Sequence, residues 1–81
     1  ASGEINSTVD DADAVLRRLK EEYSDGELLE LDGVSFEYAD WWFNVRPSNT
    51  EPLLRLVLEA RTPELMAEKK ALLLRYLGTP V

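Results

Sequence analysis

Residues 41–60 read WWFNVRPSNTEPLLRLVLEA, two alternating apolar segments on either side of a polar loop. The first segment ends in Val45 and Arg46, and the alternate residues before Val45 are aromatic: Phe43 and Trp41. After the loop, leucine recurs at every second position: Leu54, Leu56 and Leu58. A period of two is typical of a β-strand that buries one face. The stretch therefore predicts two strands joined by the loop of residues 46–52, with Arg46 ending the first strand on the face opposite Val45.

Apolar residues recur at helical spacing before and after this pair of strands. The earlier stripe comprises Ala12, Val15, Leu16, Leu19 and Tyr23. The later stripe comprises Leu65, Met66, Lys69, Leu72, Leu73, Tyr76 and Leu77. Separations of three and four residues place each set on one side of a helix, so both segments are predicted as amphipathic helices.

Residues with special backbone preferences bound the two helices. The first helix has three candidate caps: Thr8, Asp10 and Asp11. Thr62 precedes Pro63, which is the order expected at the start of the second helix. Gly26 is predicted to close the first helix in a left-handed conformation, and Gly78 followed by Pro80 is predicted to end the second.

Three further segments have the pattern of strands. Residues 4–9 place alternate residues on one side: Ile5, Ser7 and Val9. Residues 27–31 and 34–38 flank Asp32-Gly33, a tight-turn signal, and predict a hairpin. The expected order is strand, helix, three or four strands, helix. An antiparallel sheet of about four strands with one apolar face, and two helices packed on that face, give a two-layer α+β fold.

Length and composition narrow the functional classes. A chain of 81 residues is expected to form one domain, residues 1–81, too small for a deep catalytic cavity. It contains neither Cys nor His, which removes thiol nucleophiles, imidazole bases and zinc sites of these ligands. A net charge of -7 opposes nucleic-acid binding. No apolar run approaches the roughly 20 residues that cross a bilayer, and the first residues lack a secretory signal, so a cytoplasmic protein is expected.

The loop of residues 46–52 combines residue types that bind oxyanions. Arg46 offers a planar guanidinium that binds two phosphate oxygens in a fork. Small polar side chains supply further donors: Ser48, Asn49 and Thr50. The amide groups of a tight turn can converge on the same anion, and Pro47 and Pro52 restrict the loop. Glu51 is repulsive to phosphate unless it points away, pairs with an arginine or contacts a sugar hydroxyl.

On local chemistry alone, two interpretations of this region remain open. A polar surface turn between two strands is favoured over a phosphate site, because Pro, Ser and Asn are common turn residues. Arg55 lies on the polar face of the next strand. It either adds a second cation to a phosphate site or forms a surface ion pair with Glu59 or Glu37.

Other polar and aromatic features have an ordinary structural interpretation beside a functional one. Trp41 and Trp42 could stack on a sugar ring, but neighbours on a strand face opposite ways, which favours packing in the core for one and partial exposure for the other. The acidic stretch of residues 10–13 could hold a divalent metal. Capping and interaction with the helix dipole are the favoured roles for carboxylates at a helix start.

The loop and its surroundings resemble a known family. The segment RPSNTEPLLR at residues 46–55, preceded by ADWWFNV at 39–45, resembles the C-terminal signature of the α-D-phosphohexomutases, especially the phosphomannomutase/phosphoglucomutase branch. The segment SGEINS at residues 2–7 and the Asp32-Gly33 pair before a strand resemble the same branch. The similarity thus spans nearly the whole chain.

The resemblance implies that residues 1–81 are the fourth, C-terminal domain of a larger enzyme, with a fold like that of the TATA-box-binding protein. Such an enzyme interconverts hexose 1-phosphate and hexose 6-phosphate through a bisphosphorylated sugar. In that family the catalytic phosphoserine and the aspartates that bind Mg²⁺ lie in earlier domains, so this chain alone is expected to be inactive and without a cofactor of its own.

The resemblance also implies a role for the loop. The last domain of these enzymes closes over the cleft and holds the phosphate that is not being transferred. Carried onto this sequence, that role falls to four residues: Arg46, Ser48, Asn49 and Thr50. The expected partners are the phosphosugar and the other domains of the same enzyme. A stand-alone protein-interaction module with the same fold is the alternative.

Overall fold

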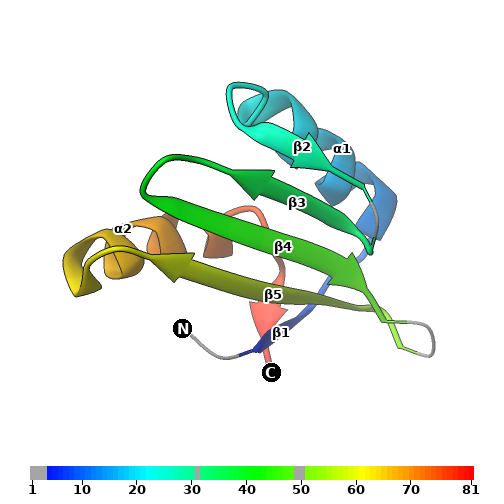
Figure 1. Cartoon of the computed structure of the whole chain (residues 1–81). Helices are drawn as coiled ribbons and strands as arrows, with labels where there is room; N and C mark the ends of the chain where they lie inside the picture. Colours follow the sequence, from blue (N-terminus) through cyan, green and yellow to red (C-terminus); the bar gives the residue numbers. More distant parts are fainter. Residues whose placement is uncertain (1–3, 31, 49–50) are drawn as a thin grey trace.

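The computed structural model of the protein describes residues 4–30, 32–48 and 51–81. Its elements follow one another in an α+β order, which confirms the predicted fold class (Figure 1). They are β1 (Ile5–Thr8), α1 (Ala12–Glu22), β2 (Glu27–Leu29), β3 (Val34–Glu37), β4 (Trp41–Pro47), β5 (Leu53–Ala60), α2 (Pro63–Leu74) and β6 (Thr79–Pro80).

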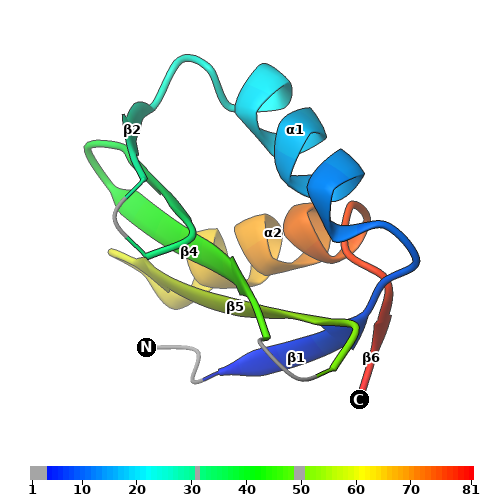
Figure 2. The ribbon, with the colours of Figure 1, turned by 90° about the vertical axis from the view of Figure 1, so that its right-hand side faces the viewer.

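In the described part of the chain the strands form one antiparallel sheet in the order β2-β3-β4-β5-β1-β6. The strands β4 and β5 lie inside the sheet and pair along the whole of β4, from Trp41 opposite Ala60 to Pro47 opposite Leu54. Both helices cover the same face of the sheet (Figure 2). Among the described residues no helix covers the opposite face, and we call it the open face.

The core lies between the helices and the sheet, and the predicted alternation sets its composition. The alternate residues of β4 and β5 that were predicted to face inward are all buried: Trp41, Phe43, Val45, Leu54, Leu56 and Leu58. Leu19 of α1 and Leu73 of α2 are fully buried against them. The Phe43 ring stacks on the Phe36 ring at a centroid distance of 4.9 Å, and the Tyr23 ring meets Phe43 edge-on at 5.0 Å.

Three local predictions need correction. Gly26 does not take the left-handed conformation, because α1 already ends at Glu22 with Tyr23 as its C-cap. Leu72 was placed on the inner stripe of α2 but is 36% exposed. Gly78 does not end α2, which stops at Leu74; the chain after Gly78 instead forms β6, an unpredicted strand that pairs with β1.

Both predicted helix starts are confirmed. The Asp11 side chain accepts a hydrogen bond from the Ala14 amide at 3.1 Å, and Thr62 Oγ1 accepts one from the Leu65 amide at 3.1 Å. Pro63 occupies the first turn of α2, where its missing amide proton has no intrahelical partner to lose. No helix in the described ranges is long and apolar enough to cross a membrane.

Replacing Thr62 with alanine is expected to lower the free energy of unfolding by about 1 kcal/mol, because the Leu65 amide loses its acceptor. Urea denaturation followed by circular dichroism measures the loss. Thr62→Ser keeps the hydroxyl and is expected to restore most of the stability. An equal loss in both variants would show that the cap hydrogen bond is not the cause.

Candidate functional site

The strand β4 carries Arg46 to the open face of the sheet, as its alternation predicts. Val45 is fully buried, so Arg46, its neighbour, points away from the core, and its side chain is 39% exposed. In the pairing of β4 with β5, Arg46 lies directly opposite Arg55. Like charges placed directly across two strands repel each other. The arrangement therefore needs compensation from neighbouring groups.

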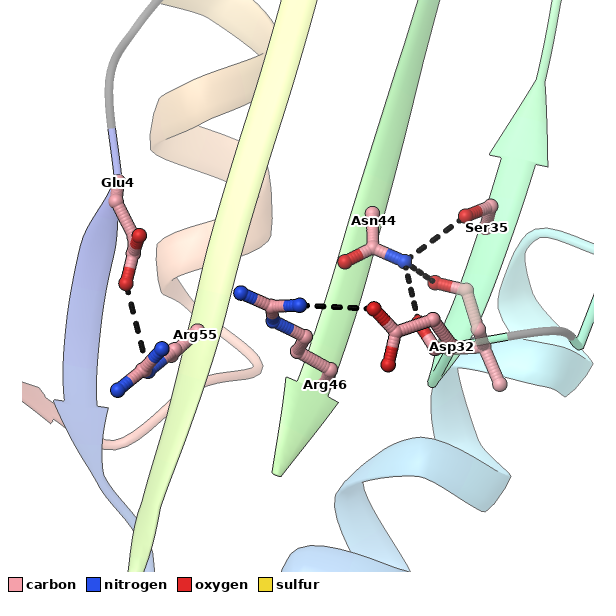
Figure 3. A network of polar contacts seen from close by, with 7 residues as sticks. Glu4, Asp32, Ser35, Asn44, Arg46 and Arg55 are labelled. Atoms are coloured by element: carbon pink, nitrogen blue, oxygen red, sulfur yellow. Dashed lines mark hydrogen bonds and ion pairs between the residues drawn. The ribbon is translucent and has the colours of Figure 1, made fainter. Parts of the chain in front are cut away.

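Two carboxylates supply this compensation, one for each arginine. Nη1 of Arg46 lies 2.8 Å from Oδ2 of Asp32, and Nε of Arg55 lies 3.4 Å from Oε1 of Glu4. Across the open face the four groups follow the order Asp32, Arg46, Arg55, Glu4 (Figure 3). We call these four residues the charge row. Its two central positive charges are flanked by two negative ones, so its formal charge is zero.

The two arginines differ in the contacts that fix their side chains. Arg46 donates a hydrogen bond to Asp32. The contact between Arg55 and Glu4 is close enough for an ion pair, yet its geometry is not that of a hydrogen bond: the buried Nε of Arg55 has no hydrogen-bond partner among the described residues. Asn6 lies opposite Arg55 in β1, and its buried Oδ1 has none there either. Arg46 is thus the better fixed of the two cations.

The turn before β3 fixes Asp32 beside Arg46. Gly33 has a φ of 76°, and a Cβ at this position would lie 2.4 Å from the carbonyl oxygen of Val45 and 2.6 Å from Cβ of Arg46. Only glycine permits this close packing of the turn on β4. Asn44 adds a second tie, because its Nδ2 donates to the main-chain oxygen of Asp32 at 2.9 Å and to Oγ of Ser35 at 2.9 Å.

Sequence reasoning missed Asp32 and Asn44 as parts of this site. One signal was present, because Asn44 shares the outward side of its strand with Arg46 in the alternating pattern. The signal for Asp32 was weaker, since the Asp32-Gly33 pair was interpreted as a turn and as part of the family resemblance, and neither interpretation placed its carboxylate beside Arg46.

The backbone of the loop is engaged within the hairpin where the structure describes it. The Ser48 amide donates to the Leu53 carbonyl at 3.0 Å, and the Leu53 amide donates to the Glu51 carbonyl at 2.7 Å. The Ser48 amide is therefore engaged within the hairpin, whereas the sequence allowed the turn amides to converge on an anion. The Ser48 side chain is half-buried, Glu51 is exposed, and the predicted donors Asn49 and Thr50 lie outside the described residues.

The two tryptophans divide as predicted. Trp41 is buried in the core, whereas Trp42 is 36% exposed on the open face, where its Nε1 donates to Glu59 at 3.3 Å. The ion pair found for Arg55 is with Glu4, which the sequence interpretation did not consider. The Asp11 side chain acts as a cap, and no group of three or more His, Cys, Asp or Glu in the described ranges could hold a metal ion.

Two tyrosines have environments that favour the neutral phenol. Burial, and then the negative charges of nearby groups, raises the pKa of Tyr23. Burial raises the pKa of Tyr38 as well, and its hydrogen bond to Asp25 at 2.7 Å raises it further. Both phenols therefore stay protonated near neutral pH. Their roles are packing and hydrogen bonding, which Tyr38 shows by stacking on Trp41 at 4.9 Å.

Comparison with known proteins places this chain in a family. The family model for "Phosphoglucomutase/phosphomannomutase, C-terminal domain" matches residues 4–75. The chain belongs to this family. A phosphomannomutase of Methanocaldococcus jannaschii is 53% identical over 68 residues, which make up 84% of this chain and 15% of that protein. A phosphomannomutase of Escherichia coli strain K12 is 42% identical over 77 residues, 90% of this chain and 17% of that protein.

A third relative carries a different name within the mutases. A probable phosphoglucosamine mutase of Pyrococcus horikoshii is 48% identical over 48 residues, 59% of this chain and 10% of that protein. The chain spans no more than 17% of the length of these three relatives. The match to the phosphoglucomutase/phosphomannomutase C-terminal domain confirms the resemblance seen in the loop motif. All four residues of the charge row lie inside the matched segment, residues 4–75.

Proposed function

We propose that this chain binds phosphosugars as the C-terminal domain of a phosphomannomutase/phosphoglucomutase. It anchors the non-transferred phosphate of hexose 1-phosphate, hexose 6-phosphate or the bisphosphate intermediate during reversible intramolecular phosphoryl transfer. One observation carries the proposal: Arg46 and Arg55 lie directly opposite each other on the open face, close to the loop that joins their strands. Membership of the family supports it.

The geometry of the two arginines suits an anion bound between them. Residues opposite each other on antiparallel strands have Cβ atoms about 4.5–5.5 Å apart, so two long guanidinium side chains can converge on one phosphate. Figure 3 shows the Arg46 guanidinium between Asp32 and Arg55, with one of its nitrogens used by Asp32. Its remaining donors can form a charge-assisted fork with phosphate oxygens. A bound anion would also relieve the repulsion between the two cations.

Small polar groups of the loop complete the proposed site. We assign the Ser48 hydroxyl and the side chains of Asn49 and Thr50 as hydrogen-bond donors to the phosphate. Glu51 is exposed and follows these donors, so in this proposal it points away from the anion or towards a sugar hydroxyl. Arg46 supplies the principal charge and Arg55 the supporting one.

Anchoring a phosphate far from the reacting bond contributes to phosphoryl transfer by orientation. Binding energy gained at the remote phosphate positions the reacting one and lowers the entropy lost in the transition state. The Mg²⁺ that a phosphohexomutase uses would lend charge to the transferred group. The described residues offer no carboxylate cluster that fits a metal ion, so in this proposal Mg²⁺ and the phosphoryl-carrying residue belong to other domains.

Replacing Arg46 with glutamine is expected to weaken phosphate binding at least about tenfold, the usual magnitude for losing hydrogen bonds from a charged group. The measurement is a titration of the ¹⁵N-labelled chain with inorganic phosphate and with mannose 1-phosphate, following backbone amide shifts. Perturbations are expected to centre on residues 46–52 and Arg55. Arg46→Lys keeps the charge without the fork and is expected to bind with intermediate affinity.

Arg61→Gln is the matched control for this experiment. Arg61 lies at the opposite end of the β4–β5 hairpin, where it pairs with Asp40 at 3.6 Å, and its loss changes the net charge by the same amount. Dispersed amide spectra first establish that each variant is folded. Shifts that do not centre on residues 46–52, or an equal loss of affinity in both variants, would contradict the proposal.

A further inference from the structure

The charge row contains two carboxylates that do not contribute to binding an anion. Asp32 and Glu4 place two negative charges next to the two arginines, so the row has no net positive charge to attract an anion. A phosphate approaching Arg46 meets the carboxylate of Asp32 already bound to the same guanidinium. At such separations the repulsion is appreciable even near a protein surface. The two arginines of the charge row are therefore well placed to bind a phosphate, but the row as a whole has no net positive charge to attract one.

The position of Asp32 is built into the fold and does not result from a mobile side chain alone. Its turn is packed on β4 through Gly33, which has no room for a Cβ against Val45 and Arg46. Its main-chain oxygen accepts a hydrogen bond from the side-chain amide of Asn44. Because both ties hold the backbone, the carboxylate stays near Arg46 even when its 76% exposed side chain rotates.

We propose that Asp32, with Glu4 as its weaker counterpart on Arg55, limits the affinity of this site for phosphate. The inference rests on the proposed function, since it assumes that Arg46 is the phosphate anchor. Asp32 acts as a resident counter-ion that the ligand must displace or tolerate. The site then holds a phosphate group long enough to orient it and releases it readily. Glu4 contributes less, because its contact with Arg55 is longer and is not a hydrogen bond.

The test is the phosphate affinity of Asp32→Asn in the 81-residue chain. An asparagine oxygen can accept the same hydrogen bond from Arg46, so the substitution removes the charge and keeps the acceptor. Inorganic phosphate is expected to bind about three to ten times more tightly than to the unmodified chain. Its affinity is also expected to fall more steeply with added salt, because the row gains a net positive charge. Glu4→Gln is expected to give a smaller gain in the same direction.

Asp40→Asn is the matched control, since Asp40 also pairs with an arginine but lies at the other end of the β4–β5 hairpin. Its effect on phosphate affinity is expected to stay below about twofold because the charge is distant and screened. Equal gains from Asp32→Asn and Asp40→Asn would overturn the inference, since total charge would then be the cause. Unchanged or weaker binding by Asp32→Asn would also overturn it and would make Asp32 a positioning residue for Arg46.

The outcome for Asp32 can be distinguished from the outcome for the proposed function. Arg46→Gln tests whether the phosphate site exists, and Asp32→Asn tests whether Asp32 limits its affinity for phosphate. If the unmodified chain binds phosphate at residues 46–52 and Asp32→Asn brings no gain, only the inference about Asp32 fails. If neither the unmodified chain nor Asp32→Asn binds, both fail. The double variant with Arg46→Gln and Asp32→Asn is expected to show no gain over Arg46→Gln alone.

Discussion

Replacing Phe43 with alanine is expected to lower the free energy of unfolding by about 3–5 kcal/mol. Phe43 is fully buried at the middle of β4, where its ring lies 4.9 Å from Phe36, 5.2 Å from Trp41 and 5.0 Å from Tyr23. Removing it leaves a cavity beside three aromatic rings, and the sheet cannot close this cavity without losing strand pairing. Native proteins have only about 5–15 kcal/mol of stability in total, so this variant loses a large fraction of it.

Guanidinium chloride denaturation followed by circular dichroism measures this loss. Trp42→Ala is the matched control, because it removes a larger aromatic ring from the next position of the same strand. Trp42 lies on the open face, so its loss is expected to cost about 1 kcal/mol or less. Similar losses in the two variants would show that burial on the inner face of β4 does not determine the stability of the domain.

Replacing Gly78 with alanine is expected to lower the free energy of unfolding by about 3 kcal/mol, the upper end of the usual range for overpacking. A Cβ at Gly78 would lie 1.5 Å from the carbonyl oxygen of Thr8 and 2.7 Å from its carbonyl carbon. Both are main-chain atoms of the residue that pairs with β6, so no side-chain rotation can make room. The end of the chain must move away from β1, which breaks the pairing of the two strands.

Hydrogen exchange reports this change locally, because the Val81 amide donates to the Asn6 carbonyl at 2.8 Å and should lose its protection. Gly26→Ala is the control. A Cβ there would lie 2.7 and 2.8 Å from two ring atoms of Tyr38 and 3.0 Å from its hydroxyl oxygen, and a side chain can shift where a backbone cannot. Fast exchange at Val81 in Gly78→Ala alone is the expected result; protection retained in that variant would show that β1 and β6 tolerate the extra carbon.

The sequence predicted the parts of the fold that depend on local periodicity. The alternation in β4 and β5 predicted every buried residue of those strands, and Thr62 with Pro63 predicted the start of α2. The pairing of β6 with β1 could not be predicted, because it joins two segments at opposite ends of the described chain and only two residues take part. The exposure of Leu72 was missed because apolar residues occupy neighbouring positions in α2, and their spacing does not show that Leu73, which is fully buried, faces the core in place of Leu72.

For the candidate site, the sequence predicted Arg46 on the outward face but not its surroundings. The placement of Arg46 beside Asp32 depends on how the β3–β4 hairpin brings residues 14 positions apart into contact. The direct opposition of Arg46 and Arg55 depends on strand register, which the sequence of the loop does not determine by itself. The roles of Ser48, Asn49, Thr50 and Glu51 in phosphate binding remain predictions.

The order of strands in the sheet also bears on aggregation. An exposed sheet edge is a template for pairing with another chain, and proteins protect such edges by keeping them short or by placing proline there. In the described structure the two edges are β2, with 3 residues, and β6, with 2 residues of which Pro80 has no amide proton to donate. The long strands β4 and β5 are enclosed between neighbours. The part of the sheet best suited to recruit a second copy of the chain is therefore the part that no second copy can reach.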